Sequence, residues 1–217
     1  MSQTQRYVLG LDLGPPGEST GLAIIEYPVV RHYAPKPVYQ VRHLQRFAIG
    51  TSYPAIFEAV MVCLPNLGRP TLVVNQTAVG TVVIRQLRQM RGAASVLAVT
   101  LAPGGAARAG HDGSTRLPKK ELITGLQLVF QTRRLKIAPT LPDAELLSRE
   151  LASYRMRAVM LDDASVQWRD GRNDDLVFAV GLAVWHAERT PSAGFAPYVH
   201  GGGDCFSLHS NGGRFIA

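Results

Sequence analysis

Residues 7–25, YVLGLDLGPPGESTGLAII, place one acid, Asp12, between two apolar runs. Residues 7–11 and 22–26 have the composition of strands, and the glycines and prolines of residues 14–21 indicate a turn between them. The stretch therefore predicts a hairpin-like pair of strands with a carboxylate at the end of the first. Such a carboxylate can bind a metal ion, face a nucleotide phosphate, or accept N–H groups of the turn.

The nucleotide interpretation fails on one residue. GPPGESTG (residues 14–21) has the glycines of a phosphate-binding loop, but that loop needs a lysine before its Ser/Thr. Glu18 stands at this place, and its charge would repel a triphosphate. The pattern therefore argues against a Walker-type NTPase.

The remaining chain alternates strand and helix signals. Three further strands are expected, at residues 38–50, 71–77 and 95–103. Apolar residues at helical spacing predict five helices, at residues 56–64, 81–92, 118–135, 143–156 and 173–189. Early strands followed by strand–helix alternation predict an α/β domain with a mixed sheet, antiparallel at first and parallel later.

Composition narrows the class of protein. We expect one domain over residues 1–189 and a Gly/Ser-rich C-terminal tail over residues 190–217. No apolar run approaches the roughly 20 residues of a membrane span, and the start lacks the pattern of a signal peptide. Lys and Arg number 23 against 16 Asp and Glu, a net charge of +7 that favours nucleic acid as a partner and anionic membrane second. We expect an intracellular protein.

Polar residues stand at the ends of three predicted core elements. Asp12 ends the first strand, Asn75 ends the 71–77 strand, and Asp174 and Asp175 begin the last helix. Ligands of open α/β sheets gather at strand ends, and paired carboxylates there can hold divalent cations. Two such ions about 4 Å apart can activate water for phosphodiester hydrolysis. Each residue also has an ordinary explanation as a turn former or helix cap, and spacing alone does not join them into one site.

Five segments, in order from residue 7 to 188, resemble the nuclease domain of tailed-phage terminase large subunits, a branch of the ribonuclease H-like (RuvC-like) fold. VLGLDLGPPGESTGLAII is similar to its first strand, catalytic Asp and hairpin, and TLVVNQTAVGTVVIRQLR to its second site strand, turn and helix. The other three are RLPKKELITGLQLVFQTRRLKIAP, AELLSRELASY and the terminal RNDDLVFAVGLAVW. The resemblance implies a ribonuclease H-like mixed sheet flanked by helices.

The resemblance also implies a catalytic site with two Mg²⁺ or Mn²⁺ ions. Asp12 would bridge both ions, and Asp175, with Asp174 as the alternative, would bind one. Asn75 stands where the family usually has an acid, and its amide can ligate a cation but brings no charge. We therefore expect weakened metal binding and reduced or silenced activity. Either the residue was changed on purpose, or the natural protein is a weak or inactive nuclease.

The implied function is that of a metal-dependent DNA endonuclease that acts in the host cell cytoplasm during virion assembly. Its partners would be double-stranded DNA, an ATPase motor domain, a small terminase subunit and the portal, with no membrane. The chain has no Walker motif, so it would be an excised nuclease domain or a stand-alone relative. Two alternatives stay open: a RuvC-like Holliday junction resolvase, and a non-catalytic DNA-binding or packaging module, which Asn75 favours.

Basic residues suggest where DNA would lie. Arg108, Arg116, Lys119 and Lys120 flank the loop at residues 104–117, and Arg133 and Arg134 end the helix that follows. Either cluster alone could be a solvated surface, and cations at a helix end also complement its dipole. With the net charge and the resemblance, we expect phosphate contacts, which read the DNA backbone rather than its sequence.

Overall fold

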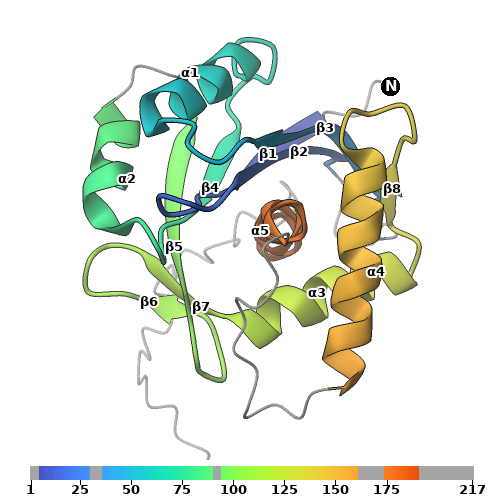
Figure 1. Ribbon diagram of the computed structural model, residues 1–217. Coiled ribbons are helices and arrows are strands. Elements are labelled where there is room, and N and C mark those ends of the chain that lie inside the picture. Colours follow the sequence, from blue (N-terminus) through green and yellow to red (C-terminus); the bar gives the residue numbers. More distant parts are fainter. Residues whose placement is uncertain (1–4, 30–35, 90–93, 161–173, 191–217) are drawn as a thin grey trace, which may run out of the picture.

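A computed structural model describes residues 5–29, 36–89, 94–160 and 174–190, without the side chains of 153–160 (Figure 1). Its described strands form one eight-stranded sheet in the order β6-β7-β5-β4-β1-β2-β3-β8. They are β1 (Gln5–Asp12), β2 (Thr20–Pro28), β3 (Tyr39–Phe47), β4 (Thr71–Asn75), β5 (Ser95–Ala102), β6 (Arg108–Ala109), β7 (Thr115–Pro118) and β8 (Leu135–Ile137).

The directions of the strands match the sequence pattern. β1, β2 and β3 form an antiparallel meander, whereas β4 lies parallel to β1 on its other side, followed by parallel β5 and β7. Apolar side chains fill both faces of the central strands, as expected for parallel strands covered by helices. The predicted mixed sheet, antiparallel and then parallel, is confirmed.

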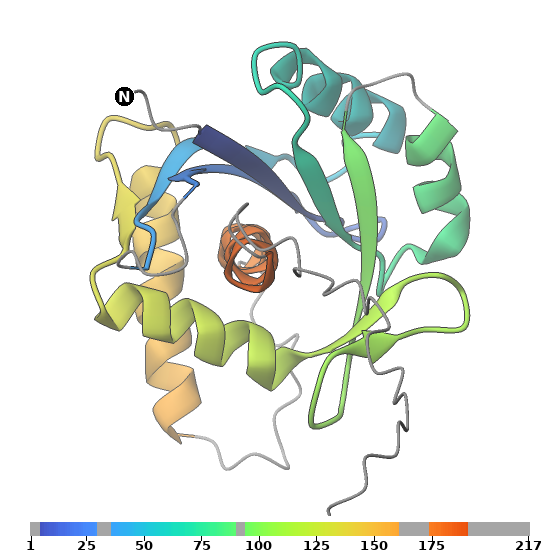
Figure 2. The same ribbon diagram turned by 180° about the vertical axis from the view of Figure 1, so that it is seen from behind.

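Helices cover both faces of this sheet (Figures 1 and 2). α1 (Tyr53–Cys63) and α2 (Gly80–Gln89) pack on one face, and α3 (Lys119–Gln131), α4 (Ala144–Met160) and α5 (Asp175–Arg189) lie on the other. Two apolar clusters result: Leu9 and Leu11 of β1 face the α1–α2 layer, and Val8 faces the layer that contains α5. This alternation follows from the two-residue period of a strand.

α5 lies directly against β1 and β2, and its residues 176–185 are all buried. Two glycines permit the close approach. A Cβ added to Gly10 would meet the carbonyl oxygen of Ala179 at 1.9 Å, and one added to Gly21 would meet that of Asp175 at 2.4 Å. No side chain fits at these positions without moving the helix, so the glycines set how near α5 lies to the strands.

The predicted helix at 118–135 is shorter than expected. α3 ends at Gln131, and Arg133 takes the left-handed conformation with φ of 56°. The N–H of Arg134 then bonds the carbonyl of Val129 at 2.9 Å, which closes the helix as a C-terminal cap. The chain continues into β8, which pairs in parallel with β3. A three-residue strand leaves no periodic signal in the sequence, as is also true of β6 and β7.

Two other expectations concern the ends of the chain and membranes. Beyond Thr190, the predicted tail at 190–217 lies outside the described residues, so the boundary at 189 stays a prediction. Among the described helices, none combines the length and the apolar character that crossing a membrane requires.

Candidate active site

Asp12 and Asn75 are neighbours at the carboxyl ends of two parallel strands. They are register partners of β1 and β4. Leu72 and Val74 face the α1–α2 layer, so Asn75, like Val73, faces α5. Asp12 faces the same side for the same reason. The strand period thus brings both polar side chains to the α5 face at one edge of the apolar layer.

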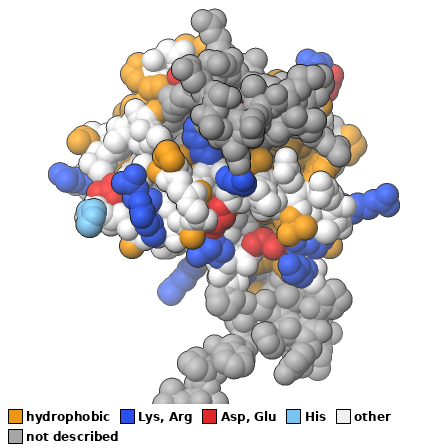
Figure 3. All heavy atoms as spheres, turned by 90° about the horizontal axis from the view of Figure 1, so that it is seen from below, with side chains coloured by type: hydrophobic (Ala, Val, Ile, Leu, Met, Phe, Trp, Pro, Cys, Tyr) orange, Lys and Arg blue, Asp and Glu red, His pale blue; other side chains and the backbone are white. Residues whose placement is uncertain are grey.

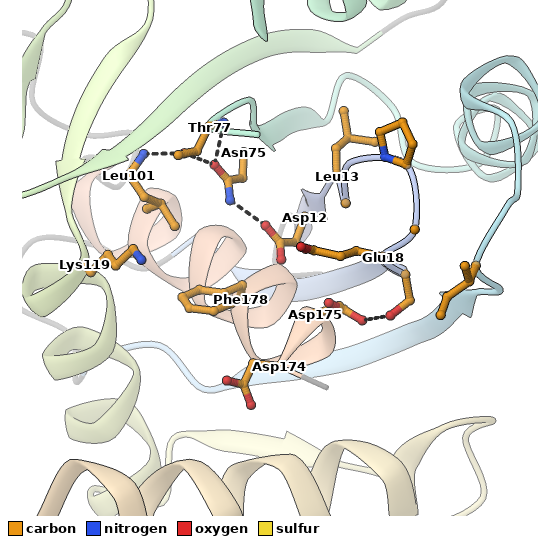
Figure 4. Close-up of a pocket in the computed structure, with 15 residues that line it drawn as sticks. Asp12, Leu13, Glu18, Asn75, Thr77, Leu101, Lys119, Asp174, Asp175 and Phe178 are labelled. Atoms are coloured by element: carbon orange, nitrogen blue, oxygen red, sulfur yellow. Dashed lines mark hydrogen bonds between the residues drawn. The ribbon is translucent and has the colours of Figure 1, made fainter. Parts of the chain in front are cut away.

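The start of α5 completes the site. Gly21 is the register partner of Asp12 in β2, and the backbone of Asp175 lies against Gly21. Asp12, Asn75, Asp174 and Asp175 therefore line one pocket of about 510 Å³ (Figure 4). Elements distant in sequence thus bring all four of the predicted catalytic residues to one place.

The amide of Asn75 has a defined orientation. Its Oδ1 accepts the Thr77 N–H at 3.0 Å and the Thr77 hydroxyl at 2.5 Å. Because a backbone N–H can only donate, the oxygen must lie on the Thr77 side. The NH₂ group therefore faces Asp12 and donates to its Oδ1 at 2.6 Å. Asn75 presents a donor to Asp12 where the resemblance implied a metal ligand.

Thr77 is held in turn by the next strand. Its hydroxyl oxygen accepts the N–H of Leu101 at 2.8 Å, while the hydroxyl hydrogen points to Asn75. Asn75 itself is 4% exposed. The orientation of the amide thus depends on a chain of hydrogen bonds that reaches into β5.

Asp175 also has protein partners. Its Oδ2 accepts a short hydrogen bond from the Ser19 hydroxyl, and the Nε of Arg46 lies 3.2 Å away. Arg46 Nε meets Asp175 as an ion pair without hydrogen-bond geometry. Burial raises the pKa of Asp175, and the Ser19 bond and the charge of Arg46 oppose that rise. The carboxylate is therefore partly neutralised by the protein.

A buried glutamate from α4 supports the start of α5. Glu150 Oε2 accepts the N–H groups of Leu176 and Val177, each at 3.2 Å, and Arg46 donates to its Oε1. These N–H groups belong to the first turn of α5, which has no helical acceptors for them. Burial raises the pKa of Glu150 to about 7, against the lowering effect of Arg46. Arg46 thus links Glu150 to Asp175.

Asp174 is the N-cap residue of α5, yet its side chain makes no capping hydrogen bond. It is buried, and Figure 4 shows its carboxylate directed away from Asp12 and Asp175. Of the two acids predicted at this helix start, Asp175 lies nearer to the strand ends.

Glu18 is a pocket residue that the sequence reasoning missed. From the sequence, Glu18 served only as the residue that argues against a nucleotide-binding loop. Figure 4 shows its side chain directed from the turn toward Asp12, and its charge acts on Asp175. The signal was present: an acid in a tight turn six residues after a strand end can fold back beside that end.

The predicted DNA-contacting residues fall into three places. Lys119 lines the pocket from the start of α3, with Lys120 next to it in the helix, whereas Arg108 and Arg116 line a second pocket on β6 and β7. Arg133 and Arg134 follow the far end of this 13-residue helix, roughly 20 Å away at 1.5 Å per residue. The structure does not bring these two arginines to the pocket.

Arg134 has an internal role. It is buried, its Nη1 lies 2.5 Å from Oε1 of Glu188, and its guanidinium stands over the ring of Tyr39 at 5.7 Å. The Tyr39 hydroxyl donates to the same Glu188 oxygen at 2.6 Å. These contacts join α5 to β3, so Arg134 has a structural role inside the fold.

The donor set fits a divalent cation only weakly. Asp12, Glu18 and Asp175 bring carboxylate oxygens to the pocket, as such ions require. The oxygen of Asn75 is turned away, and protein donors already contact Asp12 and Asp175. Within the described ranges, no three His, Cys, Asp or Glu side chains are arranged to hold a metal ion.

Comparison with known proteins identifies the fold. No family model and no curated protein matches the sequence. The large terminase nuclease from thermophilic phage G20c with bound magnesium is similar in structure, with a TM-score of 0.55 and 16% identity over 83% of this chain and 80% of that chain. Its form with bound cobalt has the same values. The human cytomegalovirus terminase nuclease domain, soaked with Mn, has a TM-score of 0.49 and 18% identity over 82% and 81%. The G20c likeness establishes the fold, the ribonuclease H-like fold of terminase nucleases, as the sequence predicted.

Proposed function

We propose that this chain is the DNA-cleaving domain of a viral packaging terminase, or a stand-alone relative, with activity strongly reduced by Asn75. The single observation that carries the proposal is the convergence of Asp12 and Asp175 on one pocket of a terminase-nuclease fold. Two carboxylates at the edge of an apolar core carry a large desolvation cost, which a bound cation would offset.

Asp12 and Asp175 would hold Mg²⁺ or Mn²⁺. Glu18 would have to move toward the ion to serve as a third carboxylate, because the described acidic side chains are not arranged around a metal site. When bound, such ions supply an activated water and stabilise the leaving oxygen of a phosphodiester. Lys119 enters the same pocket and provides a positive charge for the phosphate. Arg46 holds Asp175 in position and shares its charge, and therefore competes with a cation for this carboxylate.

The substrate in this proposal is double-stranded DNA. By analogy with terminases, the partners would be an ATPase motor domain, a small terminase subunit and the portal, in the cytoplasm of the host cell. The net charge of +7 supports a polyanionic substrate.

The test compares four proteins on supercoiled plasmid with Mn²⁺: the natural sequence, Asn75→Asp, Asp12→Asn and the double variant. We expect Asn75→Asp to nick faster than the natural sequence by at least tenfold, because it restores a negative ligand. Asp12→Asn should abolish nicking in both backgrounds. Equal rates with and without Asp12 would contradict the proposal, since the pocket would then not be the source of cleavage.

The Asn75–Asp12 hydrogen bond favours a second candidate, a non-catalytic DNA-binding module. In a module, this bond would be a permanent substitute for a cation. An inert Asn75→Asp variant that still binds DNA, together with unaltered binding by Asp12→Asn, would support the module. A four-way junction run beside the plasmid tests the resolvase alternative, which requires preference for the junction.

A further inference from the structure

Two arginines stand directly opposite each other on the β6–β7 hairpin. Arg108 and Arg116 are register partners of this antiparallel pair, so their side chains leave the same face of the sheet. Both are exposed, and both line a pocket of about 230 Å³ with the loop at residues 102–107 and Pro118. The pocket is separate from the one that contains Asp12.

Like charges directly opposite each other destabilise a strand pair. Within the described part of the chain, no acidic side chain forms an ion pair with either arginine. The hairpin's own acid, Asp112, is engaged elsewhere: its Oδ1 accepts from Ser114 and its Oδ2 from Gln76 at 2.8 Å. The two guanidinium groups thus face one pocket, and a ligand would have to supply the negative charge that balances them.

The loop that completes this pocket suits an approaching phosphate. Residues 104–107 are Gly, Gly, Ala and Ala, so no side chain extends beyond Cβ to block access. A tetrahedral phosphate oxygen can accept from a planar guanidinium fork, and two forks from opposite strands can hold one phosphate. The chemistry therefore favours a phosphate group over a flat apolar ligand.

The hairpin is held in place from the strand that carries Asn75. Gln76 is 5% exposed and donates to Thr100 Oγ1 at 3.1 Å as well as to Asp112. The Gly110 N–H bonds the Ser114 carbonyl at 2.7 Å and closes the turn. These bonds position the hairpin before any ligand binds, and they connect it to the residue next to Asn75.

The two pockets lie on opposite faces of the sheet. Leu101 of β5 and Leu117 of β7 face the α5 layer, so their chain neighbours Ala102, Arg116 and Pro118 face the other side and line the hairpin pocket there. A phosphate at the hairpin would therefore be a contact outside the central pocket. Figure 3 shows Lys and Arg side chains projecting from several places on the face seen from below in Figure 1, with Asp and Glu between them.

We propose that Arg108 and Arg116 clamp a single backbone phosphate of DNA at the β6–β7 hairpin. This inference rests on the proposed function, because it takes DNA as the substrate. Its ligand is the phosphate, not the base, so the clamp adds affinity and sets the position of the strand without sequence preference.

The test measures binding in EDTA, so it does not depend on cleavage. A labelled duplex oligonucleotide is titrated by fluorescence anisotropy at several salt concentrations against the natural sequence, R108Q, R116Q and the double variant. The matched control is Arg69→Gln, which removes an exposed charge just before β4, at the opposite end of that strand from Asn75.

A clamp on one phosphate makes a specific prediction. The double variant should bind about tenfold more weakly, and its slope of log K against log salt should decrease by about 0.9, the value for one phosphate. Each single substitution should lower the affinity for DNA nearly as much as the double substitution does. Arg69→Gln should bind DNA as the natural sequence does. Inorganic phosphate should compete more weakly with the double variant than with the control.

Two outcomes would overturn the clamp. If the double variant binds DNA with the same affinity as Arg69→Gln, the clamp is contradicted. The proposed function would still stand, since DNA would still bind. A decrease in slope of about 1.8 would show two independent phosphate contacts instead of one. Failure of every protein, including the natural sequence, to bind duplex DNA would overturn both the clamp and the proposed function.

Discussion

The side-chain NH₂ of Asn75 donates a 2.6 Å hydrogen bond to the carboxylate of Asp12, and the two residues end neighbouring parallel strands. The Asn75 NH₂ group thus satisfies the carboxylate of Asp12 without a metal ion. An acid at position 75 would instead place a second negative charge beside Asp12, and a cation between the two would be needed to offset their repulsion. Restoring Asp at this position would therefore couple folding to metal binding.

Asn75→Asp should lower the stability of the protein in EDTA. The variant keeps the acceptor for Thr77 but places a second carboxylate at hydrogen-bond distance from Asp12, at a cost of about 1–3 kcal/mol. Added Mn²⁺ should raise the melting temperature of the variant well above its value in EDTA and change that of the natural sequence little. Differential scanning fluorimetry measures both, and Asn75→Asp in an Asp12→Asn background, which lacks the facing charge, is the control.

Thr77→Val should weaken the hold on the amide of Asn75, whose oxygen would keep only the bond from the Thr77 N–H. The substitution removes the hydroxyl that donates to Asn75 Oδ1 and leaves the N–H of Leu101 without this acceptor. We expect a loss of about 1–3 kcal/mol in the free energy of unfolding, measured in urea. Thr77→Ser keeps the hydroxyl and should cost much less. Equal losses in the two variants would contradict the role assigned to the hydroxyl.

Gly21→Ala should displace the start of α5. The new Cβ would meet the carbonyl oxygen of Asp175 at 2.4 Å, a distance that forces backbone to move. We expect destabilisation of about 1–3 kcal/mol, as for overpacked cores, with loss of any Mn²⁺ response that Asn75→Asp creates. Gly17→Ala in the turn before β2 is a poor control because the φ of Gly17 is 92°, so the exposed Gly105→Ala serves instead.

Glu150 should make stability fall as pH rises above mildly acidic values. Its pKa in the folded protein is about 7, above the ordinary 4.5, so the folded state binds more protons between these values. The associated stabilisation is complete below about pH 4.5 and is lost as pH rises through about 7, with a size of up to about 3 kcal/mol. Urea unfolding across this range measures the slope.

Glu150→Gln supplies the comparison for that slope. Its amide oxygen can still accept from Leu176 and Val177, but it does not titrate. The difference in unfolding free energy between the two proteins should therefore change with pH between about 4.5 and 7. A constant difference over this range would show that Glu150 keeps the same charge in the folded and unfolded states.

Local sequence signals determined much of the architecture. The apolar runs and the turn between them predicted β1 and β2, and strand–helix alternation predicted the mixed sheet. Asp12, Asn75, Asp174 and Asp175 were site candidates because polar residues at the ends of apolar elements lie at the edge of the core, and the resemblance joined them into one predicted site that favours Asp175. These signals are local, since burial sets the period of strands and helices along the chain itself.

Contacts between distant segments decided the rest. The direction of the Asn75 amide depends on Thr77 and Leu101, the start of α5 is held by Glu150 of α4, and Arg134 is turned inward by Glu188. The pairing of Arg108 with Arg116 arises from a two-residue ladder that has no periodic signal. The sequence by itself determined which residues reach the pocket's edge. Only the tertiary structure decided which of their atoms face one another, because hydrogen bonds and ion pairs depend on the position of every neighbour that folding brings close.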